Sequence, residues 1–487
     1  MSFFGHKEDE NEQLLVDTDM PSSRPFYSKK TSIIYGSMEE FNEDNSLYGS
    51  DNSEERVEPS KNINWCLISS VFREHRADTI REILSDDRRS SAFLTSINLQ
   101  TMILGTTILS LPYCIKLSGV WSIAMIVLIG VFANITANRL FDCQHVASSS
   151  YPDLVKRVHT TFVGICKASM KTYGQYITEI MVYLNLLRSV VVLILLSDLT
   201  SDILARHGVH NYDKNILPVC WTVLLMPPIF ITRMSLIAWP SFIGLVSYIV
   251  ALAAIFVVMC LNYKSWNFSA IKTTTDLQSL GISFGIIVNS FIVHLNIPSI
   301  EGSMVNPGHF KRTSNAVFTV NIIIKIVFSV TGFLVFQDDT HQLITANIIG
   351  YQPLPLLLKI SVLFFTYFSF PGNVFVVFEL IDQKFSRYFP MVKPGGIIWL
   401  LVSRSLPMLM CLLIAILVPK FGLVLSLTGS LRGSMIVLLL PSLCYLILKW
   451  RSGGLVMRLV CILIATVAVV GGVMGMFTST RALIRNR

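Results

Sequence analysis

The feature that most constrains this chain is a series of long apolar segments that runs from residue 93 to residue 477. A bilayer core of roughly 30 Å needs about 20 apolar residues in an α-helix. Strands of a membrane barrel would alternate apolar and polar side chains, and these segments do not. The sequence therefore predicts an all-α multi-pass membrane protein with eleven spans, at 93–115, 120–142, 172–198, 214–233, 239–262, 278–302, 315–336, 355–382, 395–418, 421–447 and 455–477. Ten spans are the alternative, if 395–447 or the last segment divides differently.

Charge separates a tail from this body. Residues 1–92 hold 11 Lys/Arg and 19 Asp/Glu, a net charge of −8, whereas residues 93–487 hold 28 and 12, a net charge of +16. The tail is rich in Ser, Asn and acidic residues without a sustained helical period, so we expect it to be mostly disordered. Residues 478–487 are expected to form a short C-terminal tail. The basic residues of the body fall in short loops rather than in one patch, so no nucleic-acid partner is expected.

The positive charges of the predicted loops place the N-terminal tail in the cytosol. Loops on the side of the tail hold 13 Lys/Arg and those on the other side hold 6, which is the bias of cytosolic loops. The C-terminal Arg481, Arg485 and Arg487 count against this orientation. Asn267 begins an Asn-Phe-Ser glycosylation acceptor in a loop on the opposite side, which agrees with it.

The tail also carries a short sorting pattern. Glu10, Leu14 and Leu15 have the acidic dileucine form that clathrin adaptors bind. In a cytosolic tail this pattern predicts a clathrin adaptor as a partner. Two exposed apolar residues without a partner are the alternative, since so short a pattern often arises by chance.

Spans one and six contain residues that interrupt a helix at membrane depth, where broken backbone needs a protein or water partner. They hold corresponding positions in two five-helix halves, which is the arrangement of an inverted-repeat transporter. Free N–H groups of half-helices suit a carboxylate, and free carbonyls suit an ammonium group. An ordinary kink in each span is the alternative. The residues predicted to bind substrate are Thr101, Gly105, Thr106, Thr107, Ser290, His294 and Asn296.

Ionisable residues inside the spans are a second group of candidates. Each costs about 2.5–3.5 kcal/mol on insertion scales, so it should face the interior of the bundle. Glu179 and Arg188 are nine residues apart, about 900° of helix rotation, so they lie on opposite faces and cannot pair with each other. Proton coupling and structural ion pairs both remain open for this group, which consists of Glu179, Arg188, Glu301, Lys325 and Glu379.

Motifs of catalysis are missing from the sequence in any context that could act. We find no Ser-His-Asp, HExxH, Walker or GxGxxG arrangement. The sequence therefore predicts a protein that is not an enzyme and that has no metal or organic cofactor.

Several segments resemble the vesicular inhibitory amino acid transporter family, the carriers of GABA and glycine. They include 280–287, 298–304, 336–340 and 427–431, and the stretch from the sixth to the seventh span is the most specific. Gly105 followed by Leu-Pro-Tyr at 111–113 resembles the wider amino acid/auxin permease branch of the amino acid–polyamine–organocation transporters. The resemblance implies a LeuT-type core of a 5+5 inverted repeat plus an eleventh helix. It also implies proton-coupled antiport of small neutral amino acids into intracellular vesicles, synaptic or endolysosomal, with chloride or membrane potential as further contributors.

The lining of the proposed pocket departs from this family. Thr101 stands where the family has Asn, His294 where it has Gln, and Arg188 where it has Tyr, while Thr106 and Thr107 replace a bulkier Met-Phe pair. A guanidinium on span three could bind a second carboxylate or replace a bound cation. The family has the same residue at Glu179, Glu301, Lys325, Glu379 and Arg404.

Two other functions fit the same fold. One is an exporter of amino acids from lysosomes or vacuoles, since the direction of transport depends on gradients. The other is an amino acid sensor that signals through the N-terminal tail.

Overall fold

The structure is a computed structural model. It describes residues 91–147, 155–157, 161–209, 211–230, 234–348, 354–388, 396–418, 420–450, 452 and 454–485. The proposed sorting residues Glu10, Leu14 and Leu15, like the rest of the acidic tail up to residue 90, lie outside these ranges. Within the described ranges, ten helical segments are long and apolar enough to cross a membrane, and one shorter apolar helix joins them. Each of the eleven predicted spans corresponds to one of these segments.

The first half of the fold consists of five spans. Span one is α3 (Ala92–Leu104), η1 (Thr106–Ser110) and α4 (Leu111–Ser118), span two is α5 (Val120–Gln144), span three is α6 (Phe162–Leu184) and α7 (Leu187–Arg206), span four is α8 (Ile216–Ile229) and span five is α9 (Met234–Leu261). Between spans two and three lie the short antiparallel strands β1 (His145–Ala147) and β2 (Val155–Arg157). Span three is longer than predicted and bends where Lys171 takes a φ of 54°.

The second half repeats the count. Span six is α10 (Leu277–Asn289), η4 (His294–Asn296) and α11 (Ile297–Gly302), span seven is α12 (Phe310–Phe336), span eight is α14 (Leu354–Tyr388), span nine is α15 (Ile397–Leu417) and span ten is α16 (Phe421–Thr428), a π-helical stretch η7 (Gly429–Leu439) and α17 (Leu440–Leu448). Span eleven, α18 (Leu455–Arg485), continues helically through most of the predicted C-terminal tail. The loops hold short helical turns at Tyr263–Ser265, Phe268–Ala270, Pro307–His309, Gln337–Asp339 and Ile344–Asn347 (α13).

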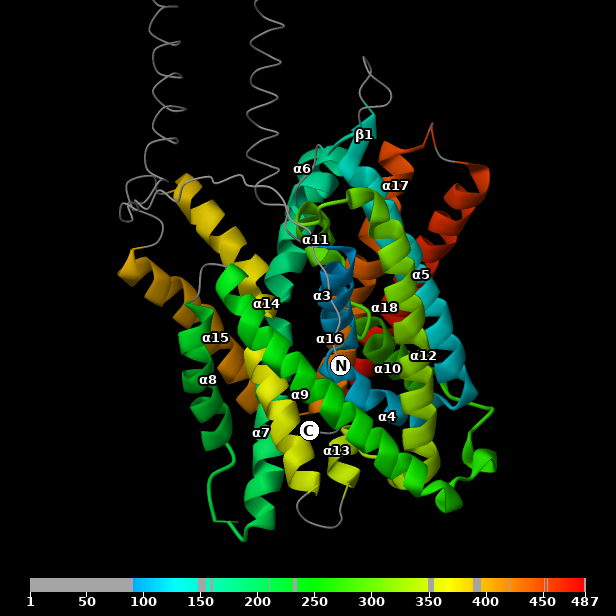
Figure 1. Cartoon of the computed structure of the whole chain (residues 1–487), viewed down its shortest axis with the longest axis vertical. Coiled ribbons are helices and arrows are strands. Elements are labelled where there is room, and N and C mark those ends of the chain that lie inside the picture. Colours follow the sequence, from blue (N-terminus) through cyan, green and yellow to red (C-terminus); the bar gives the residue numbers. More distant parts are fainter. Residues whose placement is uncertain are drawn as a thin grey trace, which may run out of the picture. The chain divides into compact units, whose positions relative to one another are not determined.

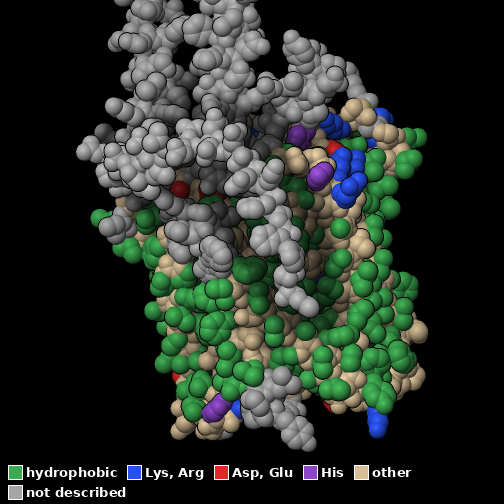
Figure 2. Space-filling model, viewed as in Figure 1, with side chains coloured by type: hydrophobic (Ala, Val, Ile, Leu, Met, Phe, Trp, Pro, Cys, Tyr) green, Lys and Arg blue, Asp and Glu red, His purple; other side chains and the backbone are tan. Residues whose placement is uncertain are grey.

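Exposed apolar side chains cover the flanks of these helices. Val257 on α9, Leu406 on α15 and Val470 on α18 are each more than half exposed, which in water would be costly and in lipid is favourable. Figure 2 shows apolar side chains over the middle of one face, with Lys and Arg toward its ends. This surface is that of a protein embedded in a membrane.

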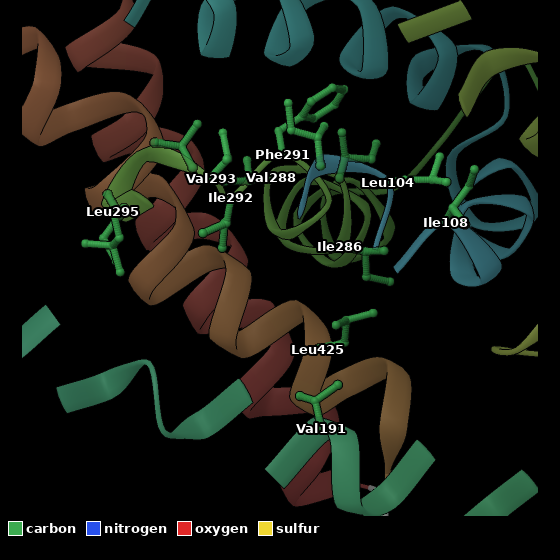
Figure 3. Packing of buried hydrophobic residues seen from close by; sticks show 14 of the residues in the cluster. Leu104, Ile108, Val191, Ile286, Val288, Phe291, Ile292, Val293, Leu295 and Leu425 are labelled. Atoms are coloured by element: carbon green, nitrogen blue, oxygen red, sulfur yellow. The ribbon is translucent and has the colours of Figure 1, made fainter. Parts of the chain in front are cut away.

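The two broken spans lie inside the bundle. In Figure 1, α3 lies in the middle of the view. The helices α9 and α14 pack along each other. The first part of span six, α10, packs against α16, η7 and α18. Figure 3 shows the apolar residues around both breaks, with Leu104 and Ile108 on either side of the first and Phe291 and Ile292 at the second. These four side chains are buried, so they form part of the apolar core around the breaks.

Glycines allow α10 to approach its neighbours closely. A Cβ added at Gly429 would overlap the backbone carbonyl of Gly285, and one at Gly285 would overlap the carbonyl of Ser426. A Cβ at Gly475 on α18 would overlap the side chain of Ser430. Small residues of this kind are what lets membrane helices pack backbone to backbone.

Candidate functional site

The first break lies at Gly105, between α3 and η1. This residue has φ 45° and ψ 167°, a left-handed φ that glycine adopts without steric cost. The chain therefore leaves the helix here and frees backbone groups of both flanking segments. The carbonyl of Gly105 is one of these groups, and it accepts a hydrogen bond of 2.9 Å from the buried hydroxyl of Tyr248 on α9.

The second break lies at residues 290–293, between α10 and η4. Ser290 caps α10, and Val293 has φ −139° and ψ −11°, outside the helical region. Pro298 lies in the first turn of α11, where its missing N–H costs no hydrogen bond. The backbone thus leaves the helix before the proline, and the proline begins the next helix.

Lys325 on α12 connects the two breaks. Its ammonium group donates a hydrogen bond of 3.1 Å to the carbonyl of Ile103, near the end of α3. It also donates to the carbonyl of Ser290, at the end of α10. The ammonium lies 3.8 Å from the centre of the Phe291 ring, and the side chain is fully buried. One ammonium reaches both carbonyls, so the breaks of spans one and six lie opposite each other, as predicted.

Arg188 lies beside the first break. It follows a further interruption, at Asn185 and Leu186, which separates α6 from α7. One terminal nitrogen of its guanidinium is 4.0 Å from the position that a Cβ on Gly105 would take. Among the described residues, the Arg188 guanidinium has no hydrogen-bond or ion-pair partner. This side chain is partly buried and places a positive charge beside Gly105.

Arg432 is a second arginine at the site, and our sequence reading missed it. It lies in η7, is 1% exposed, and donates to the side-chain oxygens of Asn185 and, at 2.9 Å, Asn289. Arg188 is close enough to act on it electrostatically. An arginine in the middle of an apolar span was itself the signal that could have found it.

The predicted substrate-binding residues differ in what they contact. The hydroxyl of Thr101 donates to the carbonyl of Ile97, and that of Ser290 to the carbonyl of Ile287, so both satisfy their own helices. Thr107 is buried beside Gly105, and Thr106 is partly buried there. These threonines therefore remain the side chains closest in sequence to the first break.

His294 faces span two. Its Nε2 lies 3.0 Å from the hydroxyl of Thr136 and 3.1 Å from the carbonyl of Ala133, both on α5. The ring is fully buried, and its Nδ1 has no partner among the described residues. Asn296, two residues further, is partly buried. Lys325 thus brings Ile103, near the end of α3, and Ser290 together, whereas His294 is directed toward α5.

Two of the acidic candidates contact basic side chains of other segments, away from the breaks. Glu179 pairs with Lys384 at 2.8 Å and accepts from Gln175 at 2.7 Å. Glu301 is fully buried and lies 3.4 Å from Nε2 of His145. As predicted, Glu179 and Arg188 do not pair with each other.

Two further candidates lie near the surface. Glu379 is exposed on α14, one turn before Asp382, whose carboxylate binds Arg404 through two hydrogen bonds of 2.7 Å. Asn267, the predicted glycosylation acceptor, is exposed, and its side-chain oxygen accepts from the backbone N–H of Ser269. Its amide is therefore accessible to solvent.

A charged cavity of about 500 Å³ opens at the end of α7, beside α13 and the start of α16. Asp198, Asp202, Lys214, His341 and Lys420 are among its lining residues. Side chains of both signs of charge line it.

Comparisons with known proteins agree with this geometry. A family profile described as transmembrane amino acid transporter protein matches residues 88–485. The chain is 27% identical to the vesicular inhibitory amino acid transporter of Homo sapiens over 381 residues, 75% of this chain and 71% of that protein. It is 24% identical to the vesicular GABA transporter of Caenorhabditis elegans over 371 residues, 74% of each chain.

A solved structure shares the fold. The inward-facing conformation of Mhp1 is similar with a TM-score of 0.50 at 16% identity, and the match covers 82% of this chain and 91% of that one. The fold is thus the predicted LeuT-type arrangement of two five-helix halves followed by an eleventh helix. Since the family match covers almost all of the described residues, this chain belongs to the transmembrane amino acid transporter protein family, whose members are transporters and not enzymes.

Proposed function

We propose that this chain is a proton-coupled secondary transporter that moves small amino acids across the membrane of an intracellular vesicle. Transport would proceed by alternating access around the facing breaks of spans one and six. The relatives are named for vesicular transport of inhibitory amino acids and of GABA, which makes small neutral amino acids such as GABA and glycine the first substrates to test.

The observation that carries this proposal is the bridge from Lys325 to the carbonyls of Ile103 and Ser290. A buried ammonium that holds both half-helices couples the two breaks mechanically. Movement of span seven, or binding of a ligand that competes for the same carbonyls, changes both breaks together.

Proton coupling in this proposal involves Glu179. Its ion pair with Lys384 joins α6 to α14, and Glu179 is almost fully buried while Lys384 is about a quarter exposed. Binding of a proton to Glu179 removes one charge of the pair and weakens that contact. A proton can thereby loosen span three from span eight. His294 is the second candidate, since its Nδ1 has no partner in the described part of the chain.

Reconstituted vesicles test the proposal. The full chain in liposomes with an acidic interior should accumulate labelled amino acid, and a protonophore should abolish the accumulation. A panel that includes neutral, acidic and basic amino acids covers the substrate question. If no member of the panel accumulates in response to the proton gradient, the proposal fails.

Localisation is a separate part of the proposal. We propose a vesicle membrane with the N-terminus in the cytosol, where the tail could bind a clathrin adaptor through Glu10, Leu14 and Leu15. Replacing both leucines by alanine should move a fluorescent fusion to the cell surface while transport in liposomes stays unchanged. Two results together would favour an amino acid sensor instead. Neither the full chain nor a variant without the tail would transport amino acids, and deletion of the tail would abolish binding of a signalling partner.

A further inference from the structure

Three basic side chains surround the breaks without an acidic partner. Lys325 and Arg432 are almost fully buried, and Arg188 is partly buried beside Gly105. Among the described residues, the carboxylates found in ion pairs bind other cations, and none pairs with these three. Arginine remains protonated in proteins, so at least two positive charges lie here without a counter-charge from the described chain.

At the breaks, the carbonyl groups already accept hydrogen bonds from other side chains, whereas a group that attracts anions has no partner among the described residues. Lys325 already binds the carbonyls of Ile103 and Ser290, and Tyr248 binds the carbonyl of Gly105. These are the groups that would otherwise accept hydrogen bonds from the ammonium group of a substrate. Groups that attract an anion remain available, since the Arg188 guanidinium has no partner among the described residues. The site therefore favours negative charge over positive charge.

Neutral partners do not offset this imbalance. Two side-chain amides, Asn185 and Asn289, satisfy the terminal nitrogens of Arg432, and they bring no charge. Its Nε is buried without a partner in the described part of the chain. An unpaired charge at this depth is costly, and a bound anion removes the cost. A zwitterion adds no net charge and would leave the surplus as it is.

We propose that Arg188, supported electrostatically by Arg432, binds a carboxylate, and that the preferred substrate is an acidic amino acid with two carboxylates and one ammonium group. This inference rests on the proposed transport of amino acids through the facing breaks. It names the class of substrate for that site. One carboxylate accepts hydrogen bonds from the guanidinium of Arg188, and the other supplies the negative charge that offsets the positive surplus at the breaks.

Ligand-dependent thermal stability of the purified full chain tests the inference directly. L-aspartate and L-glutamate should raise the unfolding midpoint at concentrations where glycine and GABA do not, because a ligand of the folded state stabilises it by mass action. Arg188→Gln should weaken binding of the acidic amino acids by at least about tenfold, the loss expected for one charge-assisted hydrogen-bonding group. Arg188→Lys keeps the charge and should retain part of the affinity.

A matched control is Arg139→Gln. Arg139 lies on α5, pairs with Asp142 at 3.0 Å, and is not at the breaks. This variant should keep the preference of the wild-type chain for acidic amino acids. If Arg188→Gln does not fold, the wild-type panel alone still decides between acidic and neutral ligands.

Two results would overturn the inference. One is stabilisation and uptake by glycine or GABA at least as strong as by aspartate and glutamate. The other is an unchanged preference in Arg188→Gln. If the preference for glycine or GABA appears only when chloride is present, that is a form of the first result, in which the arginines hold a chloride ion and not a second carboxylate. These results leave proton-driven uptake intact, whereas absence of uptake for every amino acid defeats the proposed function itself.

Discussion

The hydroxyl of Tyr248 donates a hydrogen bond of 2.9 Å to the carbonyl of Gly105, so span five holds the break in span one. Both groups are buried, and the Tyr248 ring stacks on Phe365 at 4.1 Å between centroids. We predict that Tyr248→Phe keeps this stacking but leaves the carbonyl without its donor. The expected cost is about 1–3 kcal/mol, seen as a lower unfolding midpoint. Tyr263→Phe, at an exposed loop position, is the control and should unfold like the wild type.

Two substitutions at Gly105 separate the effect of its positive φ from the effect of side-chain bulk. A Cβ here meets no atom closer than 3.8 Å, so Gly105→Ala adds the strain of a positive φ with little steric overlap. We expect a loss of about 1 kcal/mol and reduced transport. Gly105→Leu should abolish uptake while the protein remains folded, as judged by gel filtration. Gly454→Ala, where a Cβ meets nothing within 4 Å, should transport normally. Normal uptake by Gly105→Leu would place the substrate elsewhere.

Removal of the Lys325 ammonium group should destabilise the breaks of spans one and six together. Lys325→Met keeps the apolar stem but leaves the carbonyls of Ile103 and Ser290 without this donor, at a cost of about 1–3 kcal/mol for each buried group. We expect increased hydrogen exchange in residues 102–108 and 288–295 together. Protection that changes in one of these segments alone would contradict the coupling of the breaks. Lys272→Met, in an exposed loop, should alter neither segment.

Variants of the ion pair between Glu179 and Lys384 distinguish a structural role of Glu179 from a role in proton coupling. If the pair only joins α6 to α14, then Glu179→Gln and Lys384→Met should lower stability equally, and the double variant should cost little more than either one. If Glu179 also carries a proton, Glu179→Gln alone should remove the dependence of uptake on the proton gradient. We expect the second pattern, measured as uptake against internal pH. Uptake that keeps its pH dependence in Glu179→Gln would assign Glu179 a structural role.

Asp276 lies outside the spans, just before α10, and it should make the stability of the start of α10 depend on pH. Its carboxylate accepts hydrogen bonds from Ser279, which lowers its pKa below the ordinary value of 3.8. The stabilisation is therefore fully present above that ordinary value, and it is lost as the pH falls through the lowered pKa of the folded protein. Asp276→Ala should cost about 0.5–2 kcal/mol at pH 7. Asp276→Asn should keep the cap, and its unfolding midpoint should depend less on pH below 4 than that of the wild type.

Much of the fold could be predicted because a bilayer imposes length and composition on each span. The eleven segments follow from apolar runs; among the described residues ten of them are long and apolar enough to cross a membrane, whereas α8, the fourth, is shorter. The breaks of spans one and six are present as predicted. The interruption between α6 and α7 could not be predicted in the same way. Asn185 and Leu186 carry no glycine or proline signal, and tertiary contacts of Asn185 with Arg432 and with the carbonyl of Asn373 hold this stretch in place.

Side-chain partners were harder to predict than positions. His294 has the right chemistry for a substrate site, but its direction depends on how η4 turns, and this turn brings it to Thr136 on α5. The role of Tyr248 also lies outside sequence reasoning, because a tyrosine in an apolar helix shows no sign of its partner on another span. Arg432 was different, since a charge in the middle of an apolar segment is visible without a structure.

The glycines between α10, η7 and α18 determine which parts of the molecule can slide. Where the backbone of Gly429 touches that of Gly285, no side chain lies between the helices to rearrange, so even a small relative displacement produces overlap. The first half of span six should therefore travel with spans ten and eleven as one body. The hinge of span six is then the stretch 290–293, and only the short second half of that span is left to swing when the protein changes the side of the membrane to which its substrate is exposed.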